Sequence, residues 1–527
     1  MLNQLELSLP PETADDQESR KTEVAIMLGI DRSSIRGVVV RRRSIDARRS
    51  RALVRMKVDV YIDEEPADRD IPQPEYREVS GDRRVVVVGA GPAGLFAALR
   101  LIERGIRPIV VERGKDARAR RRDLVLVQRR GTVNPDSNYC FGEGGAGTYS
   151  DGKLYTRATK RGDVAAVLRT LVAHGADPSI MIDAHPHIGS NRLPGVVMAI
   201  RESLIAAGGE MRFQERVVDL VRDARGRIIG VRTATGSEFV GEGVILATGH
   251  SARDIFRLLL RSGVMIEPKP FAVGVRIEHP QPLIDRIQYH SPVRNVHLPA
   301  ASYRLSTTVR DRGVYTFCMC PGGFIVPTAT EGDEVVVNGM SLSRRDSPFA
   351  NSGMVVSIEL EDLAPYAPYG PLAGVELQKE LETMASVAGG GMQRAPAQRV
   401  VDFLAGRHSS TLPECSYNPG VASAPLHELL PRSISRRLAE GLRHFGKGMR
   451  GYLSEEGMMV GVETRTSSPV RVPRDAKTCE HPSAPGLYPC GEGAGYAGGI
   501  VSAALDGMRV ADTFQEVSAS ISFFTSS

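Results

Sequence analysis

Short runs of hydrophobic residues with recognisable periods divide the chain into segments. Residues 85–88 form an unbroken β-branched run, as expected for a strand that is buried on both faces. Residues 92–104 are compatible with a helix that Gly105 ends, and residues 109–111 form a second buried run. This pattern predicts a β–α–β unit that begins near Arg84.

Residues 1–80 follow a different pattern and are interpreted as a small α+β domain with a linker. Apolar and polar residues alternate at its start, as they do in a strand, and helix-like spacing follows. The predicted elements are a strand at 5–9, a helix at 24–30, strands at 35–40 and 53–62 with a basic turn at 41–51 between them, and a linker at 64–84.

Beyond the β–α–β unit, residues 193–204 keep helical spacing. Short strands between turn signals follow at 217–246, which is typical of an antiparallel meander. From about residue 268 to residue 448 the chain has scattered short strands, frequent proline and glycine, and fewer periodic helices. We interpret this stretch as a second domain inserted into the first.

A glycine motif joins the first buried strand to the helix, and Glu112 follows the second strand. In this motif Gly89 permits a tight turn, Gly91 lets backbone approach a pyrophosphate, and Gly94 allows close helix–strand packing. The free N–H groups of the helix start bind the anion, and the acid binds ribose hydroxyls. The alternative is a glycine-rich turn without a ligand. We favour a dinucleotide site, with contacts from Gly89, Gly91, Pro92, Ala93, Gly94, Glu112 and Arg113.

Two later segments favour FAD over NAD as the dinucleotide. The buried run 244–246 ends in small residues after the meander, and the run 487–489 ends in Glu492 between glycines, where a carboxylate can accept hydrogen bonds from ribitol hydroxyls. Gly499 then opens an apolar helix whose N-terminus favours an anionic reduced flavin. The expected contacts are Val217, Ala247, Thr248, Gly249, Gly491, Glu492, Gly499 and Ile500.

The glycine-rich segment 141–154 suits a loop pressed against a flat ring or a diphosphate. Gly144 and Gly145 are expected cofactor contacts, and Ser150, Asp151 and Lys153 are candidates for flavin or substrate contact. A solvated turn is the alternative.

Candidates for catalysis are Arg465 and His250. Arg465 lies among hydroxyl residues and could hold a substrate carboxylate, but a structural ion pair with Glu463 or another acid is equally compatible with its position. His250 could transfer a proton near the flavin. The alternative is a loop histidine that caps a helix beginning near Ser251.

The six cysteines include no Cys-x-x-Cys pair, which argues against a flavin–disulfide relay of the glutathione reductase kind. Cys318 and Cys320 are two residues apart, so on a strand both face one side. A buried strand or a flavin-facing thiol could use this spacing, and we favour packing because free cysteine mostly behaves as a small hydrophobe.

Composition adds few constraints. The 527 residues are 42% hydrophobic and 24% charged, without a run of eighteen apolar residues or a visible secretory signal, so we expect a cytoplasmic protein with no membrane partner. The net charge is +5, and nine arginines lie between Arg32 and Arg55. Such clusters attract acidic partners, but no nucleic-acid module accompanies them, so nucleic acid is not the expected partner.

Long sequence strings resemble the bacterial family of largely uncharacterised FAD-dependent dehydrogenase-like proteins, often labelled NAD(FAD)-utilising dehydrogenases, within the broad glutathione-reductase-type flavoprotein class. The resemblance covers nearly the whole chain and implies FAD binding and redox activity, while substrate and partner stay open. The strings are 42–48, 141–154, 249–254, 269–280, 318–323, 338–341, 461–471 and 491–504.

The predicted fold class is α/β, with a discontinuous Rossmann-type FAD-binding domain (81–267 and 451–516), an inserted mixed α/β substrate or cap domain (268–450), the N-terminal α+β domain (1–80) and a tail (517–527). We expect a dehydrogenase or reductase that passes hydride between flavin N5 and a small organic substrate, anionic if Arg465 binds it. No metal is expected, and NAD(P)H would have to reach the flavin directly as a transient reductant. The alternatives are an O2-using monooxygenase or oxidase, outside the tryptophan-dependent halogenases because the chain lacks tryptophan, and a non-catalytic or RNA-associated flavoprotein.

Overall fold

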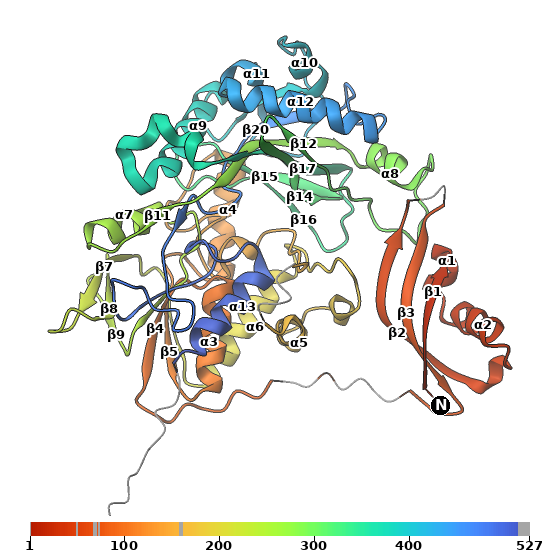
Figure 1. The fold of residues 1–527 in the computed structure, drawn as a ribbon, viewed down its shortest axis with the longest axis horizontal. Coiled ribbons are helices and arrows are strands. Elements are labelled where there is room, and N and C mark those ends of the chain that lie inside the picture. The colour runs from red at the N-terminus through yellow and green to blue at the C-terminus, as the bar shows by residue number, and fades with distance from the viewer. Residues whose placement is uncertain (1, 49–50, 67–70, 72–73, 157–161, 515–527) are drawn as a thin grey trace, which may run out of the picture.

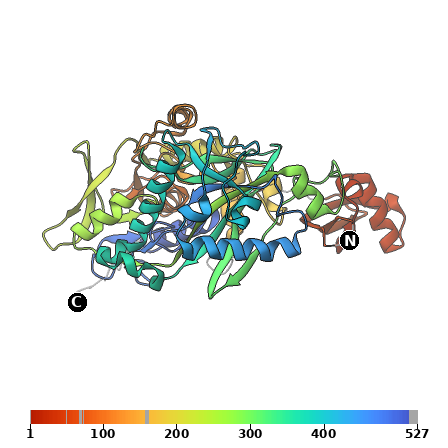
Figure 2. The same cartoon turned by 90° about the horizontal axis from the view of Figure 1, so that it is seen from above.

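The computed structural model describes residues 2–48, 51–66, 71, 74–156 and 162–514, so the predicted tail at 517–527 lies outside the described residues. Figure 1 shows three parts: a small N-terminal sheet at one end, a parallel sheet with its helices, and a larger sheet above it. Figure 2, turned by 90°, again places the N-terminal sheet at one end of the molecule.

The N-terminal part is an antiparallel sheet of order β1-β3-β2 covered by two helices. Strand pairing continues from Ile35↔Ile62 to Asp46↔Leu53, so most of the predicted basic turn at 41–51 is strand instead. Arginine side chains can extend into solvent from a strand while the backbone ladder continues, and for this reason their clustering did not indicate a turn. The elements are β1 (Leu2–Leu9), α1 (Pro11–Asp15), α2 (Gln17–Leu28), η1 (Arg32–Ser34), β2 (Ile35–Asp46) and β3 (Leu53–Ile62).

The parallel sheet has the order β22-β10-β4-β5-β6. Val85 and Val87 pack against the helix layer, whereas Val86 and Val88 pack against the meander on the other face, which explains the unbroken β-branched run. The strands are β4 (Arg84–Val88), β5 (Arg107–Val111), β6 (Glu210–Arg212), β10 (Val244–Leu246) and β22 (Leu487–Pro489).

Helices α3 and α13 lie side by side against this sheet (Figure 1). A Cβ added at Gly507 would lie 2.0 Å from the carbonyl oxygen of Ala93, so the two helices touch backbone to backbone. Val79 is also buried in this layer and donates to the Ala207 carbonyl, so the end of the predicted N-terminal region packs on the parallel-sheet part. The helices of this part are α3 (Pro92–Glu103), α4 (Ala117–Arg130), η2 (Gly145–Gly147), α5 (Val164–Ala173), η4 (Pro178–Met181), α6 (Leu193–Ala206), α7 (Arg253–Arg261) and α13 (Ile500–Ala511).

The meander consists of β7 (Val217–Arg222), β8 (Ile228–Thr233) and β9 (Glu238–Val240). The sequence pattern missed β9. The buried run 244–246 that follows the meander belongs to the parallel sheet. A three-residue strand with a half-buried phenylalanine leaves too short a pattern to be recognised.

The upper part is a seven-stranded sheet of order β13-β14-β17-β12-β20-β18-β19, which we call the cap sheet. The sequence predicted only short strands here. That prediction is wrong for β12 and β17, which have ten residues each. The predicted domain boundary at 450 is also wrong for the strand at 458–463, which pairs with β12 inside the cap sheet. The strands are β12 (Phe271–Pro280), β13 (Ser306–Val309), β14 (Arg312–Cys320), β17 (Phe349–Ile358), β18 (Ala395–Arg399), β19 (Val421–Ser423) and β20 (Met458–Glu463).

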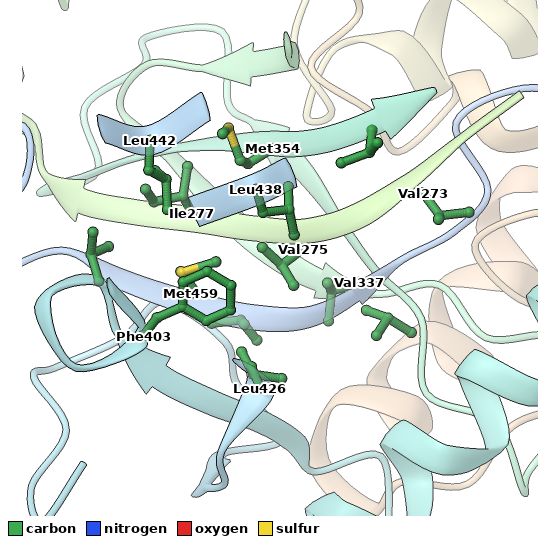
Figure 3. Close-up of a cluster of buried hydrophobic side chains, with 14 of the residues drawn as sticks. Val273, Val275, Ile277, Val337, Met354, Phe403, Leu426, Leu438, Leu442 and Met459 are labelled. Atoms are coloured by element: carbon green, nitrogen blue, oxygen red, sulfur yellow. The ribbon is translucent and has the colours of Figure 1, made fainter. Parts of the chain in front are cut away.

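The side chains of strand β12 alternate between an apolar face and a polar face of the cap sheet. Val273, Val275 and Ile277 point into the hydrophobic cluster drawn in Figure 3, where helix α12 covers them. Arg276 and Glu278 alternate with these residues and are buried among polar partners on the opposite face. The remaining elements are β11 (Glu267–Pro268), α8 (Gln281–Tyr289), β15 (Gly323–Pro327), β16 (Val337–Ser341), η5 (Leu360–Leu372), α9 (Ala373–Gly389), α10 (Val400–Ala405), α11 (Leu426–Leu429), α12 (Arg432–Gly448) and β21 (Val470–Arg471).

The described residues also bear on membrane and metal binding. No helix there combines the length and the apolar composition needed to cross a membrane. The same residues contain no group of three or more His, Cys, Asp or Glu side chains arranged to hold a metal ion.

Candidate functional site

A cavity of about 270 Å³ lies between the parallel sheet and the cap sheet. Most of the residues predicted to bind a cofactor line it, together with both catalytic candidates. Gly94, Gly144 and Gly491 are predicted contacts that do not line it. The predicted residues at its wall are Gly89, Gly91, Pro92, Ala93, Glu112, Arg113, Gly145, Val217, Ala247, Thr248, Gly249, His250, Arg465, Glu492, Gly499 and Ile500.

The three glycines of the first motif have different surroundings. Gly89 has φ 101°, and a Cβ there would lie 2.5 Å from the Ala247 carbonyl oxygen. A Cβ at Gly94 would lie 1.9 Å from the Gly89 oxygen, so this glycine serves helix–strand packing. At Gly91 the nearest described atom to an added Cβ is the Gly145 Cα at 3.9 Å. Only Gly91 therefore faces open space that a ligand could fill.

Two helices of twelve residues begin at the cavity wall. Gly91 precedes α3 and Gly499 precedes α13, and no described side chain caps either N-terminus. The first-turn N–H groups of an uncapped helix carry a partial positive charge and attract anions. The cavity is therefore electropositive at two separate points of its wall.

Gly144 and Gly491 do not line the cavity, but they connect the segments that form its wall. The Gly144 N–H donates to the Ala90 carbonyl at 2.7 Å, which ties the glycine-rich segment to the first motif. The Gly491 N–H donates to Asp506 at 2.8 Å, and a Cβ at Gly491 would lie 2.9 Å from the Ala93 Cβ. Both glycines permit close packing between segments.

The Glu112 carboxylate is buried at the end of β5. Its oxygens accept hydrogen bonds from the N–H groups of Ala90 at 2.8 Å, Gly114 at 2.8 Å and Gly142 at 2.9 Å. A carboxylate offers about four acceptor positions, so one position remains for a ligand hydroxyl. Glu112 thus holds the backbone at Ala90, Gly114 and Gly142 in place. Its binding of ribose stays a prediction.

Arg113 occupies the neighbouring part of the wall. Its guanidinium lies 4.1 Å from the Phe141 ring centroid and pairs with Asp136 at 2.8 Å and Asp254 at 2.9 Å. These contacts hold the planar group rigidly beside Glu112.

Asp151 and Lys153 of the glycine-rich segment both reach the cavity. Asp151 accepts from Arg345 at 2.6 Å and from the Ser341 hydroxyl, and Lys153 Nζ lies 3.3 Å from its Oδ2. Burial raises the pKa of Asp151, but the charges of Lys153 and Arg345 outweigh it and hold that pKa below its usual range. Asp151 is therefore a carboxylate in the folded protein, and although burial lowers the pKa of Lys153, the charge of Asp151 raises it above its ordinary value.

Arg465 belongs to a buried cluster of two arginines and two glutamates. Its guanidinium donates to Glu382 at 2.8 and 3.1 Å, to Glu334 at 2.6 Å and to the Thr330 hydroxyl at 2.8 Å. Arg253 completes the cluster by pairing with the same two glutamates. Burial raises the pKa of Glu382, but Arg253 and Arg465 outweigh it and hold that pKa below its usual range.

This arrangement corrects the sequence interpretation of Arg465. Four of its five N–H hydrogens are already used, so it cannot also hold a substrate carboxylate in a bidentate manner. The structural alternative is the better account, with Glu334 and Glu382 as partners. Glu463, the partner considered from the sequence, binds Arg276 instead.

His250 lies between Arg465 and Glu492. Its Nε2 is 2.9 Å from the Arg465 carbonyl oxygen, and its Nδ1 is 3.8 Å from the Glu492 Oε1. Because a carbonyl only accepts, Nε2 carries the proton and Nδ1 is the acceptor in the neutral ring. Helix α7 begins at Arg253 without a side-chain cap, so the alternative that His250 caps a helix is wrong.

Sequence reasoning missed several residues of the wall. They lie on a strand of the cap sheet, on β16, on helix α7 and in the segment before β7, and the fold brings these distant segments together. They are Glu215, Arg216, Asp254, Phe317 and Asn338. Cys318, for which packing was favoured, also lines the cavity, and its spacing to Cys320 was the one signal that the sequence offered.

Three segments of the chain match described domain families. Residues 82–131 match an FAD binding domain, residues 270–466 match the C-terminal domain-like region of FAD-dependent proteins, and residues 1–61 match a domain of unknown function. The first two matches support an FAD-dependent flavoprotein. They do not confirm the glutathione-reductase-type class.

Solved structures and a full-length relative complete the comparison. Glycine oxidase from Geobacillus kaustophilus covers 82% of this chain and 94% of its own at 14% identity and TM-score 0.35, and CtdE in complex with FAD covers 82% and 88% at 11% and 0.31. An uncharacterized protein of Clostridium beijerinckii is 41% identical over 97% of both chains. This protein belongs to the same family as that clostridial protein.

Proposed function

We propose that the protein is an FAD-dependent oxidoreductase that passes hydride between flavin N5 and a small organic substrate bound under the cap sheet. The observation that carries the proposal is Gly91, which faces open space at the start of an uncapped helix inside a segment that matches an FAD binding domain. FAD, when bound, supplies the two-electron chemistry, and the protein supplies binding and orientation.

The lining residues fit an extended dinucleotide. Gly91, Ala93 and the first turn of α3 would hold the pyrophosphate, and Glu112 with Arg113 would hold the adenosine end. Glu492 and the first turn of α13 would hold the ribitol and the flavin ring. A Cβ at Gly145 would come within 3.2 Å of the Gly91 Cα, so both backbones meet at the cavity without side chains between them.

The opposite wall would receive the substrate. Lys153, Phe317 and Asn338 contribute an ammonium, an apolar ring and an amide, which together suit a small polar organic molecule. His250 offers its Nδ1 as a proton acceptor next to Glu492. Arg465 gives no support for an anionic substrate, because its donors are already engaged.

The test begins with the cofactor. Purified protein should release FAD, and not FMN, on denaturation, as measured by chromatography. Stopped-flow mixing of the loaded protein with NADH, NADPH and a metabolite panel under anaerobic conditions should then bleach the flavin with one class of reductant. Recovery of FMN alone, or a colourless protein that FAD cannot reconstitute, would refute the proposal. Oxygen uptake coupled to substrate hydroxylation would replace it by the monooxygenase alternative.

A further inference from the structure

Two cysteines share one ammonium group at the cavity wall. Lys153 Nζ lies 3.6 Å from the Sγ of Cys318 and 3.6 Å from the Sγ of Cys320. Cys318 is half-buried and lines the cavity, whereas Cys320 is fully buried behind it. A cysteine with a purely packing role has no need of a half-buried lysine within 3.6 Å of its sulfur, so this contact requires another account.

The backbone brings the two thiols together. Residues two apart on a regular strand are separated by roughly 6.6 Å, near the upper limit for a disulfide. Here the pairing of β14 with β17 shifts register between Phe317 and Cys320, and Cys318 has φ 53°, in the left-handed region. A non-glycine residue held in that region costs free energy, and such strain clusters at functional sites. The bulge turns both sulfur atoms toward Lys153.

The charges around the pair favour one thiolate. Arg276 donates to the Cys318 carbonyl at 2.6 Å and to the Cys320 Sγ at 3.5 Å, while it also binds Glu463 at 2.8 Å. With Lys153, Arg345 and Asp151, the surrounding groups are three cations and two carboxylates. Burial raises the pKa of Glu463 to about 7, so these groups keep a net positive charge of at least one, which a negative charge on sulfur would offset.

The pKa values of the two thiols are shifted in opposite directions. A hydrogen bond from the Cys320 thiol lowers the pKa of Cys318 well below its ordinary value, and Lys153 and Arg276 lower it further against the effect of burial. The same hydrogen bond and burial raise the pKa of Cys320. Cys318, on the cavity side, is therefore the cysteine that ionises more readily, and Cys320 behind it is the one that keeps its proton.

We propose that Cys318 and Cys320 are a redox-active pair that exchanges two electrons with the flavin as the second half-reaction of the oxidoreductase. The inference rests on the proposed FAD site. It departs from the sequence expectation, in which the lack of a Cys-x-x-Cys pair argued against a flavin–disulfide relay, because the register shift brings a Cys-x-Cys pair together. In the oxidising direction, a sulfur–sulfur bond forms and the Cys320 S–H bond breaks. Two electrons and that one proton pass to oxidised flavin, which becomes the anionic reduced form. The reverse direction reduces the disulfide.

Electron stoichiometry tests the pair directly. Protein oxidised with ferricyanide and loaded with FAD should take up four electrons per FAD in an anaerobic dithionite titration. Cys318→Ser and Cys320→Ser should each take up two and keep their FAD. Cys415→Ser, a matched change outside the cavity wall, should still take up four. Wild-type protein with full FAD content and an uptake of two electrons would overturn the inference and leave the proposed function standing. Failure to bind FAD would overturn both.

A thiol readout does not depend on turnover. Peptide mapping of the oxidised protein should show a Cys318–Cys320 link, and in reduced protein without FAD, iodoacetamide at pH 7 should label Cys318 at least ~10-fold faster than Cys415. Lys153→Met should slow that labelling, and Lys153→Arg should restore it. Equal labelling of Cys318 and Cys415, together with an oxidised peptide that carries Cys318 and Cys320 as free thiols, would refute a redox role.

Discussion

Gly91→Val would place a branched side chain where the cavity meets the first turn of α3. The nearest described atom to the new Cβ is 3.9 Å away, and Gly91 has φ −77°, which any residue adopts. The protein without cofactor should therefore lose only about 1 kcal/mol of unfolding free energy, because valine is a poorer N-cap residue than glycine. Bound FAD adds about 2.7 kcal/mol at a free concentration of 100 Kd, and the variant should forfeit that gain.

Urea unfolding with and without FAD, together with flavin content after gel filtration, measures both quantities. Gly332→Val is the matched control, because Gly332 is exposed and has no described atom within 4 Å of an added Cβ. Gly94→Val is the opposite control, since its Cβ would overlap the Gly89 oxygen at 1.9 Å and should prevent folding. A folded Gly91→Val protein with as much FAD as Gly332→Val would refute the assignment of the pyrophosphate site.

Three further predictions address other parts of the chain. Arg465→Lys should lower the unfolding free energy by about 1.5–3 kcal/mol through lost hydrogen bonds to carboxylates, with flavin reduction unchanged; normal stability with slow reduction would return this arginine to the catalytic candidates. A protein that lacks residues 1–66 should retain its FAD, because no described residue of that segment lines the cavity, and loss of flavin from folded protein would contradict this. Burial lowers the pKa of His279 to about 4 against a hydrogen bond with the Tyr452 carbonyl, so this histidine stays neutral in the fold while the unfolded chain takes up a proton below about pH 6.5. Stability should fall by roughly 3 kcal/mol between pH 6.5 and 4, and His279→Gln should remove this part of the slope in acid unfolding.

The elements of the parallel-sheet part could be predicted from local patterns of apolar residues. The run 85–88, the helix at 92–104 and the strand at 109–111 all appear within a few residues of their predicted bounds, because each is buried on a face that its own period defines. The error at residues 41–51 arose because a charged strand has no apolar period. The boundary near 450 failed because β20 pairs with β12, about 180 residues earlier, and register over that distance leaves no local signal.

In the candidate site too, residues fixed by a local pattern could be predicted and residues placed by distant contacts could not. The glycines and Glu112 could be found because a strand–turn–helix fixes their spacing. The partners of Arg465 could not be found, because Glu334 and Glu382 come from a loop and a helix more than eighty residues away. Cys318 is a third case. Its spacing to Cys320 was visible in the sequence, but the bulge in β14 and the contact of both sulfur atoms with Lys153 form only in the folded chain.

The order of the parallel sheet has a consequence for synthesis on the ribosome. Strand β22 at residues 487–489 pairs with β10 at residues 244–246, so the whole cap sheet is translated before this edge is covered. At roughly 5–20 residues per second, the nascent β10 waits for tens of seconds with one edge unpaired. Exposed apolar edges template aggregation, so chaperone contact with nascent chains that stop short of residue 490 should be strong and should end once β22 and α13 emerge.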